Sequence, residues 1–147
     1  MYYSELVKKA CLISFEAHKN DKDKGGYPYV YHPFYLASQF DSENEVCVAL
    51  LHDVIEDYSD LYSFELLKLN GFNDNIIDAL KLLTHDDNIP YMDYIKEIGK
   101  NDIAKSVKIA DLKHNLDIRR TNGKESPKLE IYKEALEYLE LIKELID

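Results

Sequence analysis

The feature of the sequence that most restricts the fold is a segment in its middle, from Glu45 to Asp57. The unbroken apolar run from Val46 to Leu51 would cover nearly the whole circumference of a helix, so other elements must cover that helix on several sides. Ser42-Glu-Asn-Glu45 matches a capping box, which predicts that the helix starts there and runs to about Asp57. We therefore expect a central helix inside a helical bundle.

Most of the remaining chain also has apolar residues at helical spacing, with recognisable start and stop signals between the helices. No segment shows the sustained alternation of a strand, and no repeat or linker divides the chain. We predict a single all-α domain over residues 1–147 with about seven or eight helices. The predicted spans are 3–18, 33–40, 42–57, 63–70, 73–84, 90–98 and 102–119, followed by a turn over 121–124 and a last helix that opens at Ser126-Pro127.

Composition and charge limit the classes of function. The chain has 147 residues, 46% of them hydrophobic and 31% charged, as expected of a folded globular domain. Its apolar runs are too short to cross a bilayer, its first residues lack a signal-peptide core, and Cys11 and Cys47 fit free thiols in a reducing cytoplasm. The net charge of −10 weighs against a nucleic-acid partner. A phosphorylated substrate would need local positive charge, which a bound divalent cation can supply.

The second half of the central helix places ionisable residues in an apolar setting. His52 and Glu56 share one face of a helix, and Asp53 and Asp57 share another. Adjacent residues lie about 100° apart around the axis, so the imidazole of His52 and the carboxylate of Asp53 can converge on one ion. An unpaired carboxylate in a core is costly, so something should compensate these acids.

Two further polar residues stand out against apolar surroundings. His32 lies among aromatic residues and prolines, and Asp111 interrupts an apolar helix with Asn115 one turn below it. The imidazoles of His32 and His52 and the carboxylates of Asp53 and Asp111 would together suit Mn, Fe or Zn. A lone buried histidine is, however, more often a satisfied core residue than a ligand, and acids near a helix end are often solvated. Spacing alone leaves both interpretations open.

The other histidines carry less functional signal. His18 lies at the C-terminal end of its predicted helix, where a positive charge interacts favourably with the helix dipole. His85 follows Thr84 in a loop. His114 is predicted to lie on the exposed side of its helix.

Three ordered motifs resemble a known family. They are Pro28-Tyr-Val-Tyr-His-Pro33, Ala49-Leu-Leu-His-Asp-Val-Ile-Glu-Asp57 and Lys108-Ile-Ala-Asp-Leu-Lys-His-Asn115. Their order resembles the HD phosphohydrolase superfamily, and more narrowly the hydrolase domain of RelA/SpoT proteins and their small stand-alone bacterial relatives. The similarity extends from about Ala17 to Asp117.

The resemblance implies an all-α HD-type bundle with a divalent metal, most often Mn²⁺, with Fe, Zn, Ni or Co as alternatives. The implied metal ligands are His32, His52, Asp53 and Asp111. Glu56 and Asp57 would position or activate the attacking water. The implied substrate contacts are Lys24, Tyr29 and Asn115, the last of which could instead orient Asp111.

The implied reaction is hydrolysis of a phosphoester or diphosphate on a nucleotide. Characterised relatives remove the 3′-pyrophosphate of guanosine tetraphosphate or pentaphosphate. This chain departs from them at Asp23-Lys24, where they carry an Arg-Lys pair that helps to hold the base, and at Thr84-His85, where Thr-Lys is usual. We expect the metal chemistry to survive and the specificity for guanosine tetraphosphate to weaken. We expect no synthetase activity, because a chain of this length has no room for the synthetase domain of the long proteins. Alternatives are a non-catalytic nucleotide sensor, a hydrolase of nucleoside monophosphates or NADPH, and a helical interaction domain without a ligand.

Overall fold

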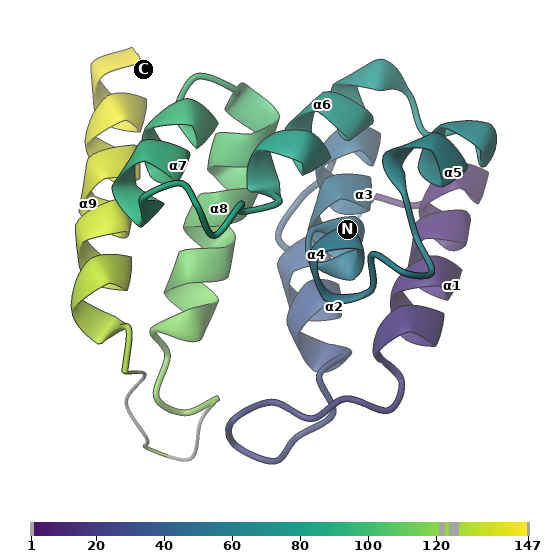
Figure 1. Ribbon diagram of the computed structural model, residues 1–147, viewed down its shortest axis with the longest axis horizontal. Coiled ribbons are helices and arrows are strands. Elements are labelled where there is room, and N and C mark those ends of the chain that lie inside the picture. Colours follow the sequence, from purple (N-terminus) through teal and green to yellow (C-terminus); the bar gives the residue numbers. More distant parts are fainter. Residues whose placement is uncertain (1, 121–122, 124–126, 147) are drawn as a thin grey trace.

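Helix α3 (Glu43–Leu51) lies in the interior of the molecule, as its apolar sequence requires (Figure 1). The computed structural model describes residues 2–120, 123 and 127–146. The remaining helices in these ranges are α1 (Glu5–His18), α2 (Tyr31–Ala37), α4 (Val54–Asp57), α5 (Phe64–Leu69), α6 (Asp74–Leu83), α7 (Tyr91–Ile98), α8 (Asp102–Asn115) and α9 (Leu129–Ile146). No strand occurs in the described residues, so the prediction of an all-α fold is confirmed.

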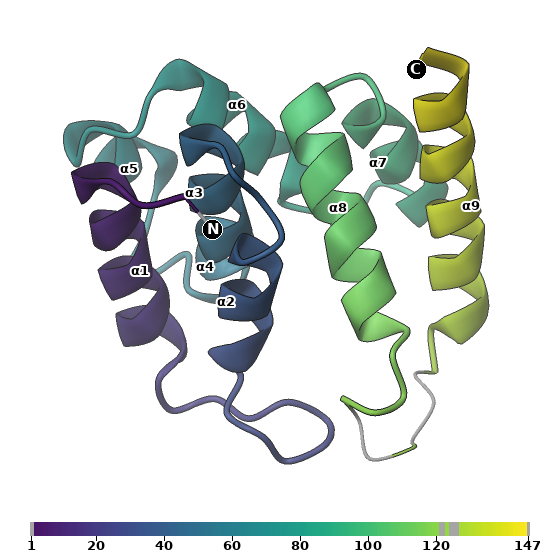
Figure 2. The same ribbon diagram turned by 180° about the vertical axis from the view of Figure 1, so that it is seen from behind.

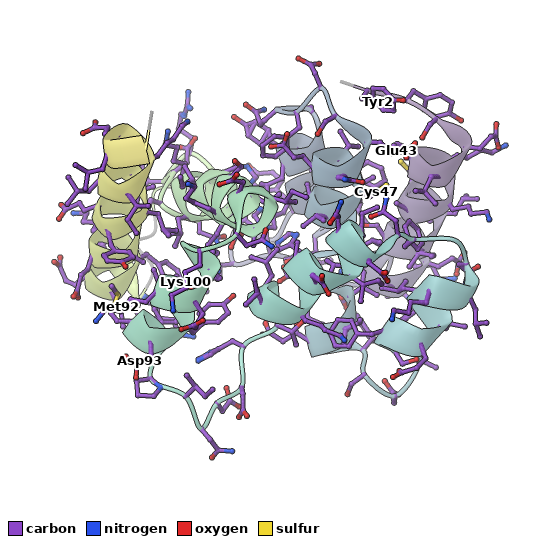
Figure 3. All side chains as sticks on the ribbon, turned by 90° about the horizontal axis from the view of Figure 1, so that it is seen from above. Tyr2, Glu43, Cys47, Met92, Asp93 and Lys100 are labelled. Carbon is purple, nitrogen blue, oxygen red and sulfur yellow. The ribbon has the colours of Figure 1, made fainter. Side chains whose placement is uncertain are left out.

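Helix α3 packs against α1, α2, α6 and α8, and every side chain from Val46 to Leu51 is buried. Figures 1 and 2 show α1 and α2 beside α3 on one side of the molecule, with α7, α8 and α9 grouped on the other. Figure 3 shows Cys47 on the side of α3 that faces α1. Cys47 and the half-buried Cys11 are both free thiols, as predicted. None of the described helices has the length and apolar character needed to cross a bilayer.

The predicted helix starts are confirmed by their caps. The Ser42 hydroxyl accepts a hydrogen bond from the Glu45 amide at 3.4 Å, which is one of the two bonds of a capping box. The Glu45 carboxylate accepts from the same hydroxyl at 2.9 Å. Ser63 and Asn73 likewise accept from the amides three residues ahead, at the starts of α5 and α6. These bonds satisfy amides that a helix leaves without partners at its first turn.

The helix predicted over 42–57 is in fact broken at His52 and Asp53, which separates α3 from α4. This break accounts for nine helices in the described residues instead of seven or eight. The Nδ1 atom of His52 donates to the Ala49 carbonyl at 2.7 Å, because a carbonyl oxygen can only accept. The side chain thereby competes with the backbone for that carbonyl, and Asp53 adopts a φ of −106° and a ψ of −2°.

Other boundaries differ from the prediction by a few residues: α1 begins at Glu5 and not at residue 3, and α2 ends at Ala37 and not at residue 40. Helix α2 starts at Tyr31, ahead of Pro33, because a proline in the first turn removes an amide that has no helical partner there. Helix α8 ends at Asn115 rather than near residue 119, where Asp117 accepts a hydrogen bond from the Arg119 amide in a turn. The predicted turn residues Thr121, Asn122 and Lys124, and the helix-opening Ser126, lie outside the described residues.

Candidate metal centre

Three segments that are distant in the sequence bring the four predicted ligands together. His32 comes from α2, His52 and Asp53 from the break after α3, and Asp111 from α8. The Oδ1 atom of Asp111 lies 2.8 Å from His32 Nε2 and 3.6 Å from His52 Nε2. His32, His52 and Asp53 each offer one donor atom, and these three atoms lie within 4.8 Å of one another.

His52 presents an unsatisfied nitrogen to this cluster. Its Nδ1 is bound to Ala49, so in the neutral imidazole Nε2 carries a lone pair. Nε2 is buried and makes no hydrogen bond among the described residues, although the Asp53 carboxylate lies 3.0 Å away. A lone pair that faces a carboxylate is repulsive unless a proton or a metal ion lies between them. Burial opposes a charged imidazole, but Asp53 and Asp111 together raise the pKa of His52 well above its usual value. The two carboxylates therefore make this position attractive to a cation.

The second ring nitrogen of His32 is held by another imidazole. His32 Nδ1 lies 2.7 Å from His114 Nδ1, and the two rings stack within 1° of parallel. The prediction that His114 is on the exposed side of its helix is wrong: it lies three residues after Asp111, one turn along the same face. Burial, followed by the nearby His32 and Arg120, lowers the pKa of His114 to about 4, so this ring is neutral near pH 7.

Each carboxylate of the cluster has a further partner. The Tyr29 hydroxyl donates to Asp53 Oδ2, so this predicted substrate contact is engaged with a predicted ligand. Asp111 accepts from Asn115 Nδ2 at 3.0 Å and from Lys108 Nζ at 3.0 Å. Second-layer bonds of this kind fix the orientation of metal ligands and maintain their charge.

Both carboxylates are therefore ionised in the folded protein. Burial alone would raise the pKa of Asp111, but the Lys108 ammonium and the two imidazoles hold it well below its usual value. Burial opposes the ionisation of Asp53 too, and the His52 imidazole outweighs it and lowers its pKa. From the sequence, Lys108 is a candidate phosphate contact and by default an ordinary surface lysine. Its side chain is instead only 12% exposed and lies over the rings of Tyr91 and Tyr94.

The cluster opens into a cavity of about 540 Å³. Glu56 and Asp57 line this cavity together with all four predicted ligands, and Lys24 does not. Glu56 is fixed in place because its Oε1 accepts from the His85 amide at 2.7 Å. Partial burial, and then the charges of Asp53 and Glu56, raises the pKa of Asp57 to about 6.

The residues of the cavity suit a bound divalent cation. Its described lining contains five carboxylates, from Asp53, Glu56, Asp57, Asp87 and Asp111, against the cationic side chains of Lys108 and Lys128. The buried, unbonded His52 Nε2 adds an imidazole nitrogen at the same place. A mixed set of imidazole and carboxylate ligands is typical of Mn, Fe and Zn sites.

Comparisons with known proteins agree with this architecture. No protein-family model matches the chain. Two curated proteins of Arabidopsis thaliana, both named GTP diphosphokinase RSH1, chloroplastic, are 35% identical to it over 68 residues, which is 44% of this chain and 8% of theirs. The chain thus spans only a small part of the length of these relatives.

A solved structure of a metazoan ortholog of SpoT that hydrolyses ppGpp superposes with a TM-score of 0.73, at 21% identity, over 95% of this chain and 87% of that one. The chain has the SpoT-type fold. The resemblance read from the three motifs is therefore confirmed at the level of the fold, as an all-α HD-type bundle. In this SpoT-type fold, the motif residues converge on the one cavity described above.

Replacement of His114 by alanine is expected to weaken Mn²⁺ binding by about 10- to 100-fold, the usual effect of losing a partner that orients a ligating histidine. Titration calorimetry with MnCl₂ measures the change. His114→Asn is the matched variant, because its amide oxygen can still accept from His32 Nδ1, and it should lose less affinity. Equal Mn²⁺ affinity in wild-type and His114→Ala proteins would contradict the role given to this ring.

Proposed function

We propose that this protein is a metal-dependent phosphohydrolase that acts on a phosphoester or diphosphate of a nucleotide. The observation that carries the proposal is that His32, His52, Asp53 and Asp111 meet beside Glu56 and Asp57 in one cavity. The SpoT-type fold, shared with a protein that hydrolyses ppGpp, supports guanosine 3′,5′-bis(diphosphate) as a substrate and its 3′-pyrophosphate as the group removed.

The four ligands would hold the ion through the imidazole nitrogens and the two ionised carboxylates. A bound Mn²⁺ or similar ion would polarise a phosphoryl oxygen and acidify the attacking water. The residues themselves keep this arrangement in place: Tyr29 holds Asp53, and Lys108 and Asn115 hold Asp111. His52 is kept in the tautomer that ligates through Nε2 by its bond to Ala49.

The two neighbouring acids have different surroundings, which assigns them different tasks. Glu56 is oriented by the His85 amide, whereas the side chain of Asp57 makes no hydrogen bond or ion pair to the described residues. Asp57 is therefore available to accept the proton of the water that attacks phosphorus. The bond from phosphorus to the ribose 3′ oxygen then breaks, the 3′ oxygen takes up a proton from protonated Asp57 or from water, and pyrophosphate and guanosine 5′-diphosphate are released. Glu56 orients the water.

The direct test is product analysis by anion-exchange chromatography after incubation with Mn²⁺ and a panel of nucleotides. The panel contains guanosine 3′,5′-bis(diphosphate), nucleoside mono- and triphosphates and NADPH. Release of pyrophosphate or phosphate from a nucleotide supports the proposal. Tight nucleotide binding without any product, across several metals, would instead indicate a sensor, and an inert protein that retains no metal would contradict both.

Addition of Mn²⁺ to the metal-free protein is expected to raise its melting temperature. At a concentration of 100 times Kd the ion contributes about 2.7 kcal/mol to the free energy of unfolding, which corresponds to roughly 5–10 °C for a domain of this size. Scanning calorimetry with and without MnCl₂ measures the shift. Asp74→Asn removes an exposed carboxylate outside the cavity, so this variant should show the same rise in melting temperature as the wild type. His52→Ala should show no rise. A shift that survives in His52→Ala would place the ion elsewhere.

A further inference from the structure

A second, smaller cavity of about 250 Å³ adjoins the metal cavity. We call it the side cavity; its lining is Lys22, Asp23, Lys24, Tyr29, Asn115, Arg120 and Tyr132. Tyr29, Asn115 and Tyr132 line both cavities and form the boundary between them. Among the described residues, the lining of the side cavity has three cationic side chains against one carboxylate, in a chain whose net charge is −10.

Arg120 is held in the side cavity by two neighbours. Its Nη1 donates to Asn115 Oδ1 at 2.8 Å, and its Nε lies 3.9 Å from Asp23 Oδ2. The Arg120 side chain is 13% exposed, so it is a positioned cation and not a freely moving surface residue. Its Nη2 makes no hydrogen bond to the described residues, which leaves the donors of one nitrogen for a ligand.

Asp23 has a structural role at the position where the resemblance implies an arginine. Its Oδ1 accepts from the amides of Gly25 at 2.9 Å and Tyr27 at 3.0 Å, which closes the loop, while Oδ2 faces Arg120. The acid therefore fixes a guanidinium that another part of the chain supplies. Asn115 connects this arginine to the metal cluster, because its Nδ2 donates to Asp111 while its Oδ1 accepts from Arg120.

We propose that the side cavity binds a second phosphoryl group of a nucleotide that is phosphorylated at two positions, while the group to be hydrolysed lies in the metal cavity. The proposal rests on the proposed function and adds a specificity residue, Arg120. A guanidinium matches a phosphoryl group in planar, paired hydrogen bonds. Lys22 and Lys24 line the same cavity and add positive charge. Substrates phosphorylated at one position would lose this second anchor.

The test compares Arg120→Gln with Arg119→Gln, a matched variant whose arginine is 89% exposed and whose ion-pair partner in the described part of the chain is Asp117. Binding of guanosine 3′,5′-bis(diphosphate) is measured by calorimetry in EDTA, where turnover is stopped. Loss of charge-assisted hydrogen bonds should raise Kd about 10- to 100-fold for Arg120→Gln, with little change for Arg119→Gln. Arg120→Lys, which keeps the charge, should lie between them.

Kinetics in Mn²⁺ separate binding from positioning. For the same nucleotide, Arg120→Gln should raise KM and leave kcat within a few fold, whereas a purely structural effect through Asn115 and Asp111 would lower kcat. For bis(p-nitrophenyl) phosphate, which has a single phosphoryl group, Arg120→Gln should raise KM far less than it does for guanosine 3′,5′-bis(diphosphate). Equal Kd and KM in the two glutamine variants would overturn the proposal, as would a wild-type protein that neither binds nor hydrolyses the probe. If binding weakens only in Arg120→Gln, and neither the wild type nor any variant hydrolyses the nucleotide, the result would support the side cavity as a phosphoryl site and reject the proposed hydrolase activity.

Discussion

His52→Ala is expected to lose bound metal and to reduce hydrolysis by at least about a thousandfold, because metal-ion catalysis contributes several kcal/mol to the stabilisation of the transition state. The substitution removes the unbonded Nε2 nitrogen from the centre of the cluster, which lies 3.0 Å from Asp53 and 3.6 Å from Asp111, whereas Lys108 still pairs with Asp111. Metal content by atomic emission and product release by chromatography measure the two effects separately.

The control for this prediction is His85→Ala, which removes a histidine from the same cavity without removing a predicted ligand. The His85 side chain donates from Nε2 to the Ile89 carbonyl oxygen at 2.8 Å, and the amide that holds Glu56 belongs to the His85 backbone. The control should keep its metal. If His52→Ala also retained a full complement of Mn²⁺, the ligand set proposed here would be wrong.

Asp57→Asn is expected to lower kcat by about 100- to 10,000-fold, the range typical of a lost general base, while metal content stays unchanged. Because Asp57 must be ionised to accept a proton, and its pKa is raised to about 6, wild-type activity should rise as the pH increases and fall as it drops through about 6. A bound cation would move this inflection downward. The variant should lose that limb of the profile.

Asp87→Asn provides the comparison for the Asp57 variant, since Asp87 is another acid of the same cavity and has no assigned proton-transfer role. Its kcat should stay within about threefold of the wild-type value. A pH–rate profile of Asp57→Asn that still falls below about 6, with kcat near wild type, would transfer the role of base to another group.

The four proposed ligands stand out in the sequence because each is a polar residue in strongly apolar surroundings. His52 follows the buried run Val46 to Leu51 and Asp111 interrupts an apolar helix, so the burial of these two groups followed from hydrophobic patterning alone. Their convergence on one ion did not follow, because it depends on how α2, α3 and α8 pack. The ordered motifs supplied that information, and the geometry of the folded chain agrees with it.

The parts of the site that were missed depend on contacts between segments and not on periodicity. Arg120 lies beyond the end of α8, where no helical repeat constrains the direction of its side chain. His114 could have been placed correctly, since a residue three positions after Asp111 shares its face. The break at His52 was also missed, because a side chain that competes for a backbone carbonyl leaves no signal in hydrophobic spacing.

The bond from His52 to the Ala49 carbonyl has a consequence for how this site can change during evolution. The same imidazole that offers Nε2 to the cluster also ends α3 and thereby sets the direction in which α4 carries Glu56 and Asp57. A different ligand residue at position 52, such as aspartate, could restore a coordinating atom without restoring the break. Selection for regained activity from a position 52 knockout is therefore expected to return histidine and not a chemically similar substitute.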